Sequence, residues 1–136
     1  MSSATPGRLS YLHASAFVKL VVPERETRAL IEALDATTVW VSAAVVEVEV
    51  VRAVRRADPA AVETARRRLA ALRFLRPTDP IRHRAGELNP PELGPLRAVH
   101  LSTALAVADE LGAFYCYDER LATAAAAAGL PVRAPA

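Results

Sequence analysis

The sequence predicts an α/β fold, in which a mainly parallel central sheet of about five strands is covered by helices on both faces as a three-layer α/β/α sandwich. Short apolar segments that are typical of buried strands alternate with longer segments that have helical periodicity. The 136 residues are 52% hydrophobic and 24% charged, which is the composition of a globular protein with one core. We therefore expect residues 1–136 to form a single domain.

The first third of the chain contains two expected strand–helix units. Residues 8–13 form an apolar run without clear alternation, as in a strand that is buried on both faces. Residues 14–22 have helical spacing that ends before Pro23, and residues 24–34 form an amphipathic helix. Residues 37–42, TTVWVS, are β-branched and aromatic, which predicts the second strand.

The segment at 43–57, AAVVEVEVVRAVRRA, is ambiguous in its composition. Its valines favour a strand, but the turn residues that would link it to the preceding strand are missing. A helix that ends at Arg56 suits its length better. Asp58 should then cap the next helix, with Pro59 in its first turn, and that helix should run to about Arg73.

The C-terminal half continues the alternation of strands and helices. We expect a strand at 74–77, a helix at 79–88, a proline-rich loop at 89–95, a helix at 96–111, a strand at 113–117, a helix at 118–128 and a short strand at 130–135. Asp79 should cap the first of these helices. Gly112 and Gly129 should end the other two, because glycine commonly follows the last turn of a helix.

Cysteine usage and hydropathy narrow the location of the protein. Cys116 is the single cysteine, so an internal disulfide is excluded and a reducing compartment is indicated. The longest uncharged apolar stretch, residues 36–46, is shorter than the roughly 20 residues that a membrane helix needs. Residues 1–10 lack the pattern of a secretion signal. We expect a cytoplasmic protein without a membrane partner.

The charge is distributed unevenly along the chain. Between residues 52 and 84, ten arginines oppose three acids, which is a local balance of +7, although the whole chain carries only +2. A basic segment of this kind favours a face that binds phosphate groups or an acidic partner. A solvated helix face that keeps the protein soluble is the other interpretation, and the sequence leaves both open.

Chemically active side chains follow three of the expected strands. The first strand ends at His13, the second ends at Ser42 shortly before Glu47 and Glu49, and a later strand ends just before Asp118. In open parallel sheets, ligands collect beyond the carboxyl ends of the strands. The sequence has no glycine-rich phosphate loop, paired-cysteine metal motif or nucleophile-elbow serine. Acids at strand ends are therefore the candidate site.

Four segments in order resemble the motifs of a known family. YLHASAFVKLVVPE is similar to the opening motif YLDTSALVKL, and VSAAVVEVEVVRAVRR is similar to a second motif with a glutamate before an arginine-containing helix. PLRAVHLSTALA resembles LDAIHLATAL, and YCYDERLATAAAAAGLPV resembles TYDRRLAAAARAAGLPV. On these segments, which span nearly the whole chain, the protein resembles the PIN-domain family and, within it, the VapC-type toxins of toxin–antitoxin pairs.

The resemblance implies a PIN-like fold and a chemistry. The implied activity is endonucleolytic cleavage of RNA with Mg²⁺ or Mn²⁺ held by clustered carboxylates. Hard divalent cations prefer oxygen ligands, and a bound cation activates water and stabilises charge on the phosphate. The resemblance also implies a small antitoxin protein as partner, which often lays a C-terminal segment across the toxin, and relatives that often form homodimers.

The four acids of the family fall on His13, Glu49, Arg97 and Asp118, so two acids are kept and two are replaced. Glu49 and Asp118 are the expected metal ligands, with Glu47 as a competitor for the role of Glu49. Arg97 is expected to bridge the two carboxylates in place of the ion, since guanidinium groups pair well with carboxylates.

Other matched positions have weaker assignments. Ser15, His100 and Thr103 also match the motifs, and His100 is expected to pack within its helix. His13 should lie near the former metal position or be a buried core histidine. A soft-metal site from His13, His100 and Cys116 is a further alternative, although their spacing matches no zinc motif.

Three functions follow from this pattern. The first is a VapC-like toxin-family protein whose metal site is degenerate and whose cleavage of RNA is weak or absent. The second is an active metal-dependent endoribonuclease that uses Glu49 and Asp118, helped by Glu119 or Asp109. The third is a non-catalytic module that binds an antitoxin or RNA.

Overall fold

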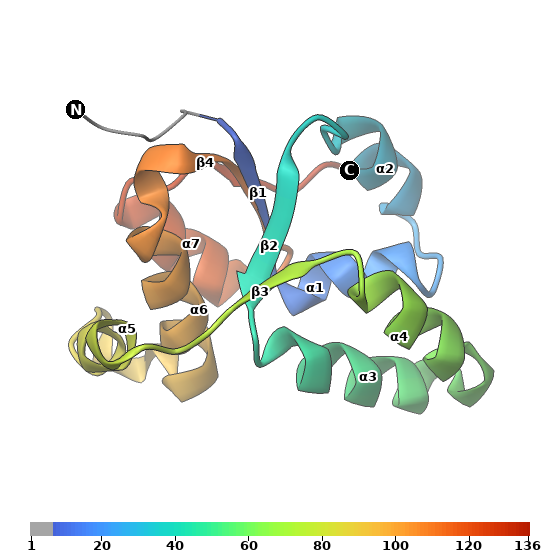
Figure 1. Cartoon of the computed structure of the whole chain (residues 1–136), viewed down its shortest axis with the longest axis horizontal. Coiled ribbons are helices and arrows are strands. Elements are labelled where there is room, and N and C mark those ends of the chain that lie inside the picture. Colours follow the sequence, from blue (N-terminus) through green and yellow to red (C-terminus); the bar gives the residue numbers. More distant parts are fainter. Residues whose placement is uncertain (1–6) are drawn as a thin grey trace.

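The computed structural model describes residues 7–136. Residues 1–6, which are part of the N-terminal segment examined for a secretion signal, lie outside the described residues. Within the described part, five strands form one sheet in the order β3-β2-β1-β4-β5, and every neighbouring pair is parallel (Figure 1). The strands are β1 (Leu9–Leu12), β2 (Val39–Ala43), β3 (Arg73–Leu75), β4 (Leu111–Tyr115) and β5 (Val132–Arg133). The expected parallel sheet is therefore confirmed.

β1 is the central strand, and all four of its residues are buried. Tyr11 is in register with Val41 of β2, and Leu12 is in register with Tyr115 of β4. A central strand of a parallel sheet is apolar on both faces because helices cover both faces. This position explains the apolar run without alternation at the start of the sequence.

The first face of the sheet is covered by the helices of the N-terminal half. They are α1 (Ala14–Phe17), α2 (Thr27–Ala33), α3 (Val46–Ala57) and α4 (Val62–Leu69). On α3, Val46, Val50 and Val54 are fully buried at a spacing of four residues, which is the stripe of a helix. The interpretation of the valine-rich segment as a helix is confirmed, since tertiary burial of this stripe outweighs the strand propensity of valine.

The second face is covered by α6 (Pro95–Ala106) and α7 (Glu119–Ala127), and α5 (Asp79–Ala85) packs on α6 (Figure 1). Ser102 of α6 connects this helix directly to α5, because its hydroxyl donates to the Ile81 carbonyl of α5 at 2.7 Å. The core on this side includes Tyr11, Phe114, Leu101 and Leu121. Helices on both faces give the three-layer α/β/α sandwich that the sequence predicts.

Several expected boundaries differ in the structure. The helix expected at 14–22 is α1 followed by a 3₁₀ turn, η1 (Val18–Leu20), and the helix expected from residue 24 begins at Thr27. Asp58 caps as expected, since its Oδ1 accepts from the Ala60 N–H. The helix after it, however, begins with a 3₁₀ turn, η2 (Pro59–Ala61), and ends at Leu69, because Arg73 already belongs to β3.

Two expected helix ends were wrong. Asp79 is not a cap but the first residue of α5, and it pairs with Arg82 one turn later. Gly112 does not end a helix, because α6 ends at Ala106, a 3₁₀ turn η4 (Ala108–Glu110) follows, and β4 begins at Leu111. A Cβ on Gly112 would lie 2.9 Å from the Cα of Gly7, so this glycine permits close contact between two backbone segments. Gly129 follows α7 with φ +92°, as expected.

Candidate functional site

The four residues chosen from the sequence line one cavity at the carboxyl edge of the sheet. His13 follows β1, Asp118 follows β4 and begins α7, Glu49 is in the first turn of α3, and Arg97 is in the first turn of α6. The cavity has a volume of about 350 Å³ and is lined by His13, Glu49, Gly94, Pro95, Leu96, Arg97 and Asp118. The parallel topology brings these residues together, because it places the ends of β1 and β4 side by side.

Arg97 and Asp118 form an ion pair inside this cavity. The Arg97 Nε donates to Asp118 Oδ2 at 2.8 Å, and Asp118 Oδ1 accepts from the Leu121 N–H at 3.2 Å as the N-cap of α7. Burial acts to raise the pKa of Asp118, but the Leu121 N–H and the Arg97 guanidinium together hold this pKa below its ordinary value. Both oxygens of this carboxylate therefore already have a protein donor.

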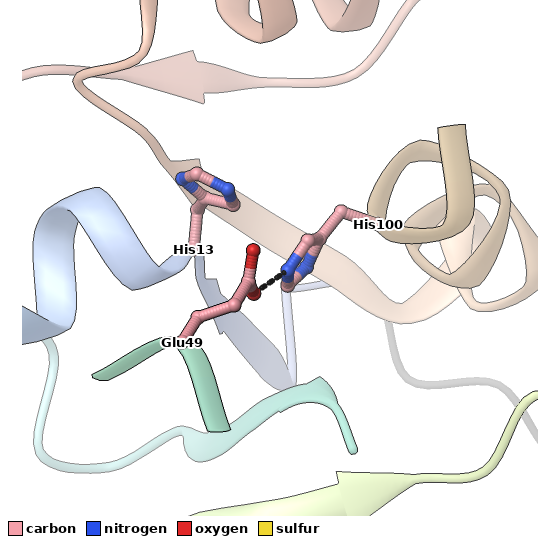
Figure 2. A group of neighbouring side chains, drawn as sticks. All are labelled: His13, Glu49 and His100. Atoms are coloured by element: carbon pink, nitrogen blue, oxygen red, sulfur yellow. Dashed lines mark hydrogen bonds and ion pairs between the residues drawn. The ribbon is translucent and has the colours of Figure 1, made fainter. Parts of the chain in front are cut away.

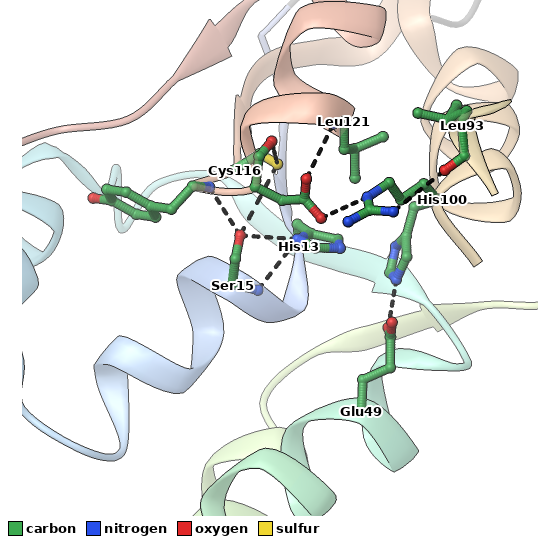
Figure 3. Close-up of polar contacts among 10 residues, drawn as sticks. His13, Ser15, Glu49, Leu93, His100, Cys116 and Leu121 are labelled. Atoms are coloured by element: carbon green, nitrogen blue, oxygen red, sulfur yellow. Dashed lines mark hydrogen bonds and ion pairs between the residues drawn. The ribbon is translucent and has the colours of Figure 1, made fainter. Parts of the chain in front are cut away.

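Glu49 is held by a buried chain of hydrogen bonds. Its Oε1 lies 2.6 Å from His100 Nε2 (Figure 3). His100 Nδ1 lies 2.7 Å from the Tyr11 hydroxyl, and that hydroxyl accepts from the Ala43 N–H at 3.1 Å. Burial raises the pKa of Tyr11 above its ordinary value, so the hydroxyl keeps its proton. The Glu49 carboxylate oxygen accepts the Nε2–H of His100, and the Tyr11 hydroxyl contacts the other ring nitrogen.

The expected bridge by Arg97 was only half right. The guanidinium contacts Asp118 and, through Nη1, the Leu93 carbonyl at 3.4 Å, while Glu49 is bound by His100. His100 is fully buried in its helix, as expected, but its contact with Glu49 is one that sequence reasoning missed. The sequence contained one signal for this contact. His100 is three residues after Arg97, and residues three apart on a helix share a face, so His100 faces the same site as Arg97.

His13 is a buried residue that also borders the cavity, with a relative exposure of 6%. Its Nδ1 accepts from the Ser15 N–H at 3.2 Å, as the N-cap of α1, and lies 2.8 Å from Ser15 Oγ. Burial lowers the pKa of His13 to about 4, and neighbouring His100 adds to this effect. The ring is neutral at pH 7, and its Nε2 makes no hydrogen bond within residues 7–136.

Ser15 connects His13 to the loop after β4. Its Oγ accepts from the Tyr117 N–H at 2.8 Å and lies 4.0 Å from Cys116 Sγ (Figure 3). Burial raises the pKa of Cys116 to about 11, so the sulfur is a thiol at pH 7. This hydroxyl therefore fixes the position of the His13 ring relative to the end of β4.

The other candidate acids lie outside this constellation. Glu47 is exposed, because it is two residues from Glu49 and points to another side of α3. Asp109 is in η4, which precedes β4 and so lies at the amino end of the strand. Glu119 is exposed and lines a different cavity. Thr103 bonds only within its helix, donating to the Val99 carbonyl at 2.7 Å.

The donors in the cavity do not match a magnesium site. Mg²⁺ requires near-octahedral oxygen ligands and is usually bound through carboxylates. Both oxygens of Asp118 accept protein hydrogen bonds, one oxygen of Glu49 accepts from His100, and the cationic Arg97 lines the same cavity. His13, Glu49 and His100 form a separate group whose potential ligand atoms all lie within 4.8 Å of one another.

Comparison with known proteins agrees with the fold. The PIN domain family matches residues 10–127. Ribonuclease VapC46 of Mycobacterium tuberculosis H37Rv is 41% identical over 125 residues, which cover 92% of this chain and 96% of that protein. Ribonuclease VapC35 of the same strain is 39% identical over 129 residues, and ribonuclease VapC47 of strain CDC 1551 is 33% identical over 130, with the same coverage.

The chain belongs to the PIN-domain family, as a member of its VapC-type toxins. The family resemblance seen in the four sequence motifs is thereby confirmed. Among residues 7–136, no helix has both the length and the apolar character that crossing a membrane requires.

Proposed function

We propose that this chain is the toxin-fold component of a toxin–antitoxin pair in which cleavage of RNA with Mg²⁺ or Mn²⁺ is weak or absent. The observation that carries the proposal is the 2.8 Å ion pair between Arg97 and Asp118. Arg97 occupies the position of one family acid and pairs with another. The positive charge that a metal ion would bring to Asp118 is supplied by the protein itself.

A rough Coulomb estimate supports this proposal. Replacing an aspartate by an arginine changes the local charge by two units beside an ion of charge two. At a separation of about 5 Å and an effective dielectric of about 20, the change is on the order of 10 kcal/mol before solvent screening. Arg97 has a side-chain exposure of 37%, so screening reduces this value. Even a modest repulsive energy that remains after screening weakens metal binding, since each 1.4 kcal/mol lowers the affinity about tenfold.

The proposed partner is a small antitoxin protein, and the contact surface that we propose for it is a groove that shares Glu49 and Leu96 with the cavity. This groove of about 660 Å³ is lined by Val45, Val48, Glu49, Arg52, Ala53, Arg55, Arg56 and Leu96. Val48 and Leu96 are large apolar residues with exposures of 57% and 51%. A lining that combines apolar residues with three arginines fits an amphipathic acidic segment, and RNA is the competing occupant. A cytoplasmic location and a homodimer belong to the same proposal.

The proposal is tested by an RNA cleavage assay on the purified chain in Mg²⁺ and in Mn²⁺. We expect the wild type to cut no faster than the Glu49→Gln variant, and we expect metal-dependent cleavage to appear when His13→Asp and Arg97→Asp are combined. Wild-type cleavage in Mn²⁺ that is lost in Glu49→Gln would contradict the proposal. A gel-shift assay with the same RNA then separates binding without cleavage from no binding.

The second candidate function is an active metal-dependent endoribonuclease. One observation favours it: Glu49 and Asp118 line the same cavity, and no hydrogen bond within residues 7–136 involves Glu49 Oε2. In that case Arg97 releases Asp118 when the ion binds. The same assay decides between the two functions.

A further inference from the structure

Beside the Arg97–Asp118 pair, three other side chains form a different set of donors. We propose that His13, Glu49 and His100 bind a divalent transition-metal ion of the zinc, cobalt or nickel type. One potential ligand atom of each side chain lies within 4.8 Å of the other two. The rings of His13 and His100 are 4.5 Å apart between centroids and nearly perpendicular, at 80°. Figure 2 shows the Glu49 carboxylate reaching up from α3 toward both rings.

The donor types select the class of ion. Imidazole nitrogens suit zinc, copper, iron and nickel, whereas carboxylates and water suit magnesium. In catalytic zinc sites three protein ligands and one water are common, with zinc–nitrogen and zinc–oxygen distances of about 2.0–2.2 Å. This group has two imidazoles and one carboxylate, so its nitrogen donors outnumber its oxygen donors, which disfavours Mg²⁺ and suits a borderline ion.

The separation of the donors allows an ion to enter between them. Ligands on one such ion are about 3.5 Å apart when the bonds are about 2.1 Å long. Glu49 and His100 are now in direct contact at 2.6 Å, and they move apart slightly when the ion takes the place of their shared proton. Glu49 is half-buried at the edge of α3, while both histidines are buried, so the carboxylate is the donor that adjusts.

Each histidine is held from behind in the manner of a metal ligand. His13 Nδ1 lies 2.8 Å from Ser15 Oγ, and His100 Nδ1 lies 2.7 Å from the Tyr11 hydroxyl. Metal-binding histidines almost always donate their second ring N–H to such a partner, which fixes the ring and its tautomer. A hydroxyl can accept as well as donate, so His100 can carry its proton on Nδ1 and leave Nε2 free for an ion. His13 Nδ1 accepts from the Ser15 N–H at 3.2 Å, so binding through Nε2 requires this contact to give way to an Nδ1–H that donates to Ser15 Oγ.

The protein contains acceptors for the hydroxyl protons that this arrangement displaces. When His100 Nδ1–H donates to Tyr11, the Tyr11 hydroxyl needs a new acceptor. Ser42 Oγ is buried, has no hydrogen-bond partner within residues 7–136, and lies close enough to Tyr11 to become that acceptor. The Ser15 hydroxyl likewise has Cys116 Sγ at 4.0 Å. The metal-bound arrangement therefore satisfies the one buried side-chain oxygen of the described residues that is otherwise unpaired.

Arg97 opposes this ion less strongly than an unpaired cation would. Its guanidinium is paired with Asp118 at 2.8 Å, so the two charges largely cancel at the neighbouring position. The pair also keeps Asp118 from joining the ligands. The substitutions at His13 and Arg97 thus act together, because one supplies a nitrogen donor and the other withdraws an oxygen donor.

The test is a titration of the purified, metal-free chain, without a polyhistidine tag, with Co²⁺ followed by visible absorption. We expect one Co²⁺ per chain, displaced by Zn²⁺ and unaffected by excess Mg²⁺. His13→Ala should weaken binding by more than the roughly 10–100-fold that loss of a supporting partner costs, and Ser15→Ala should weaken it by about 10-fold. His83→Ala is the matched control, because His83 is an exposed histidine on α5. This variant should bind Co²⁺ with the same affinity as the wild type.

Two results would overturn the proposal: no binding of Co²⁺ or Zn²⁺ by the wild type, and equal binding by His13→Ala. Circular dichroism checks that each variant is folded. If His13→Ala does not fold, Glu49→Gln replaces it, because this change removes the anionic oxygen at constant size, and unchanged affinity in that variant would equally reject the site. RNA is absent from this experiment, so its outcome is independent of the cleavage assay.

Discussion

The Arg97 guanidinium and the Asp118 carboxylate meet at 2.8 Å although they are 21 positions apart in the chain. Their contact joins the first turn of α6 to the N-cap of α7 across the carboxyl edge of the sheet. A cation and an anion therefore stand at two neighbouring positions where the family resemblance implies two acids. This relationship has consequences for the titration of the site.

Replacing Arg97 by alanine should raise the pKa of Asp118 toward its ordinary value. The guanidinium is one of the groups that lower this pKa, and the Leu121 N–H remains in the variant. A carboxyl whose folded pKa is depressed stabilises the fold above its unfolded pKa, and this stabilisation is lost as the pH falls through the folded pKa. In Arg97→Ala this loss should therefore be smaller and should be complete at a higher pH than in wild type.

Carboxyl-carbon NMR titration of Asp118 measures this shift directly. Arg84→Ala serves as the control, because Arg84 is an exposed residue of α5 and should leave the Asp118 titration unchanged. An equal Asp118 pKa in wild type and Arg97→Ala would show that the ion pair does not persist in solution.

The stability of the metal-free protein should fall between pH 7 and pH 5 because of His13. Its folded pKa is lowered to about 4 by burial, so the unfolded chain binds a proton in this range that the folded chain does not. The expected contribution is about 2 kcal/mol between pH 7 and pH 5, given an unfolded pKa of about 6.5. Urea unfolding of wild type and His13→Gln at both pH values isolates it, and an identical pH dependence would rule it out.

Tyr11→Phe should destabilise the protein strongly. The hydroxyl accepts from the Ala43 N–H and contacts His100 Nδ1, and its loss leaves two buried polar groups without their partner. We expect a decrease of about 2–4 kcal/mol in the free energy of unfolding, measured in urea. Tyr115→Phe is the matched control, because its hydroxyl makes a single bond to the Ala33 carbonyl at 3.0 Å and should cost about 1 kcal/mol. Equal costs for both variants would refute the role given to Tyr11.

Gly112→Ala should also be destabilising, for a steric reason. The added Cβ would lie 2.9 Å from the Gly7 Cα and 3.0 Å from the Gly7 carbonyl oxygen, so a backbone segment has to move. The expected cost is about 1–3 kcal/mol in thermal or urea unfolding. At Gly86 a Cβ meets only the His83 carbonyl at 3.5 Å, so Gly86→Ala should be neutral or slightly stabilising. A neutral Gly112→Ala would mean that this close approach is not maintained.

Much of the fold is predictable because its signals are local. The buried apolar run of β1, the valine stripe of α3 and the glycine after α7 each follow from patterns within a few residues. Of the two helix ends that were wrong, the one at Gly112 depends on a distant contact. Gly112 looks like a helix terminator in the sequence, and only its approach to Gly7 reveals another role.

The sequence by itself determined the family, the order of strands and helices, and the gathering of Glu49 and Asp118 at one edge of the sheet. The family follows from the resemblance of the four motifs, the order of the elements from local periodicity, and the gathering of the two acids from the parallel topology, which aligns the strand ends. Tertiary structure alone decided which partner each carboxylate has. Glu49 and Asp118 lie on different elements, and the packing of α6 places His100 against the first and Arg97 against the second. Since a hydrogen bond tolerates only a few tenths of an ångström, its partner depends on helix packing that the linear pattern does not encode.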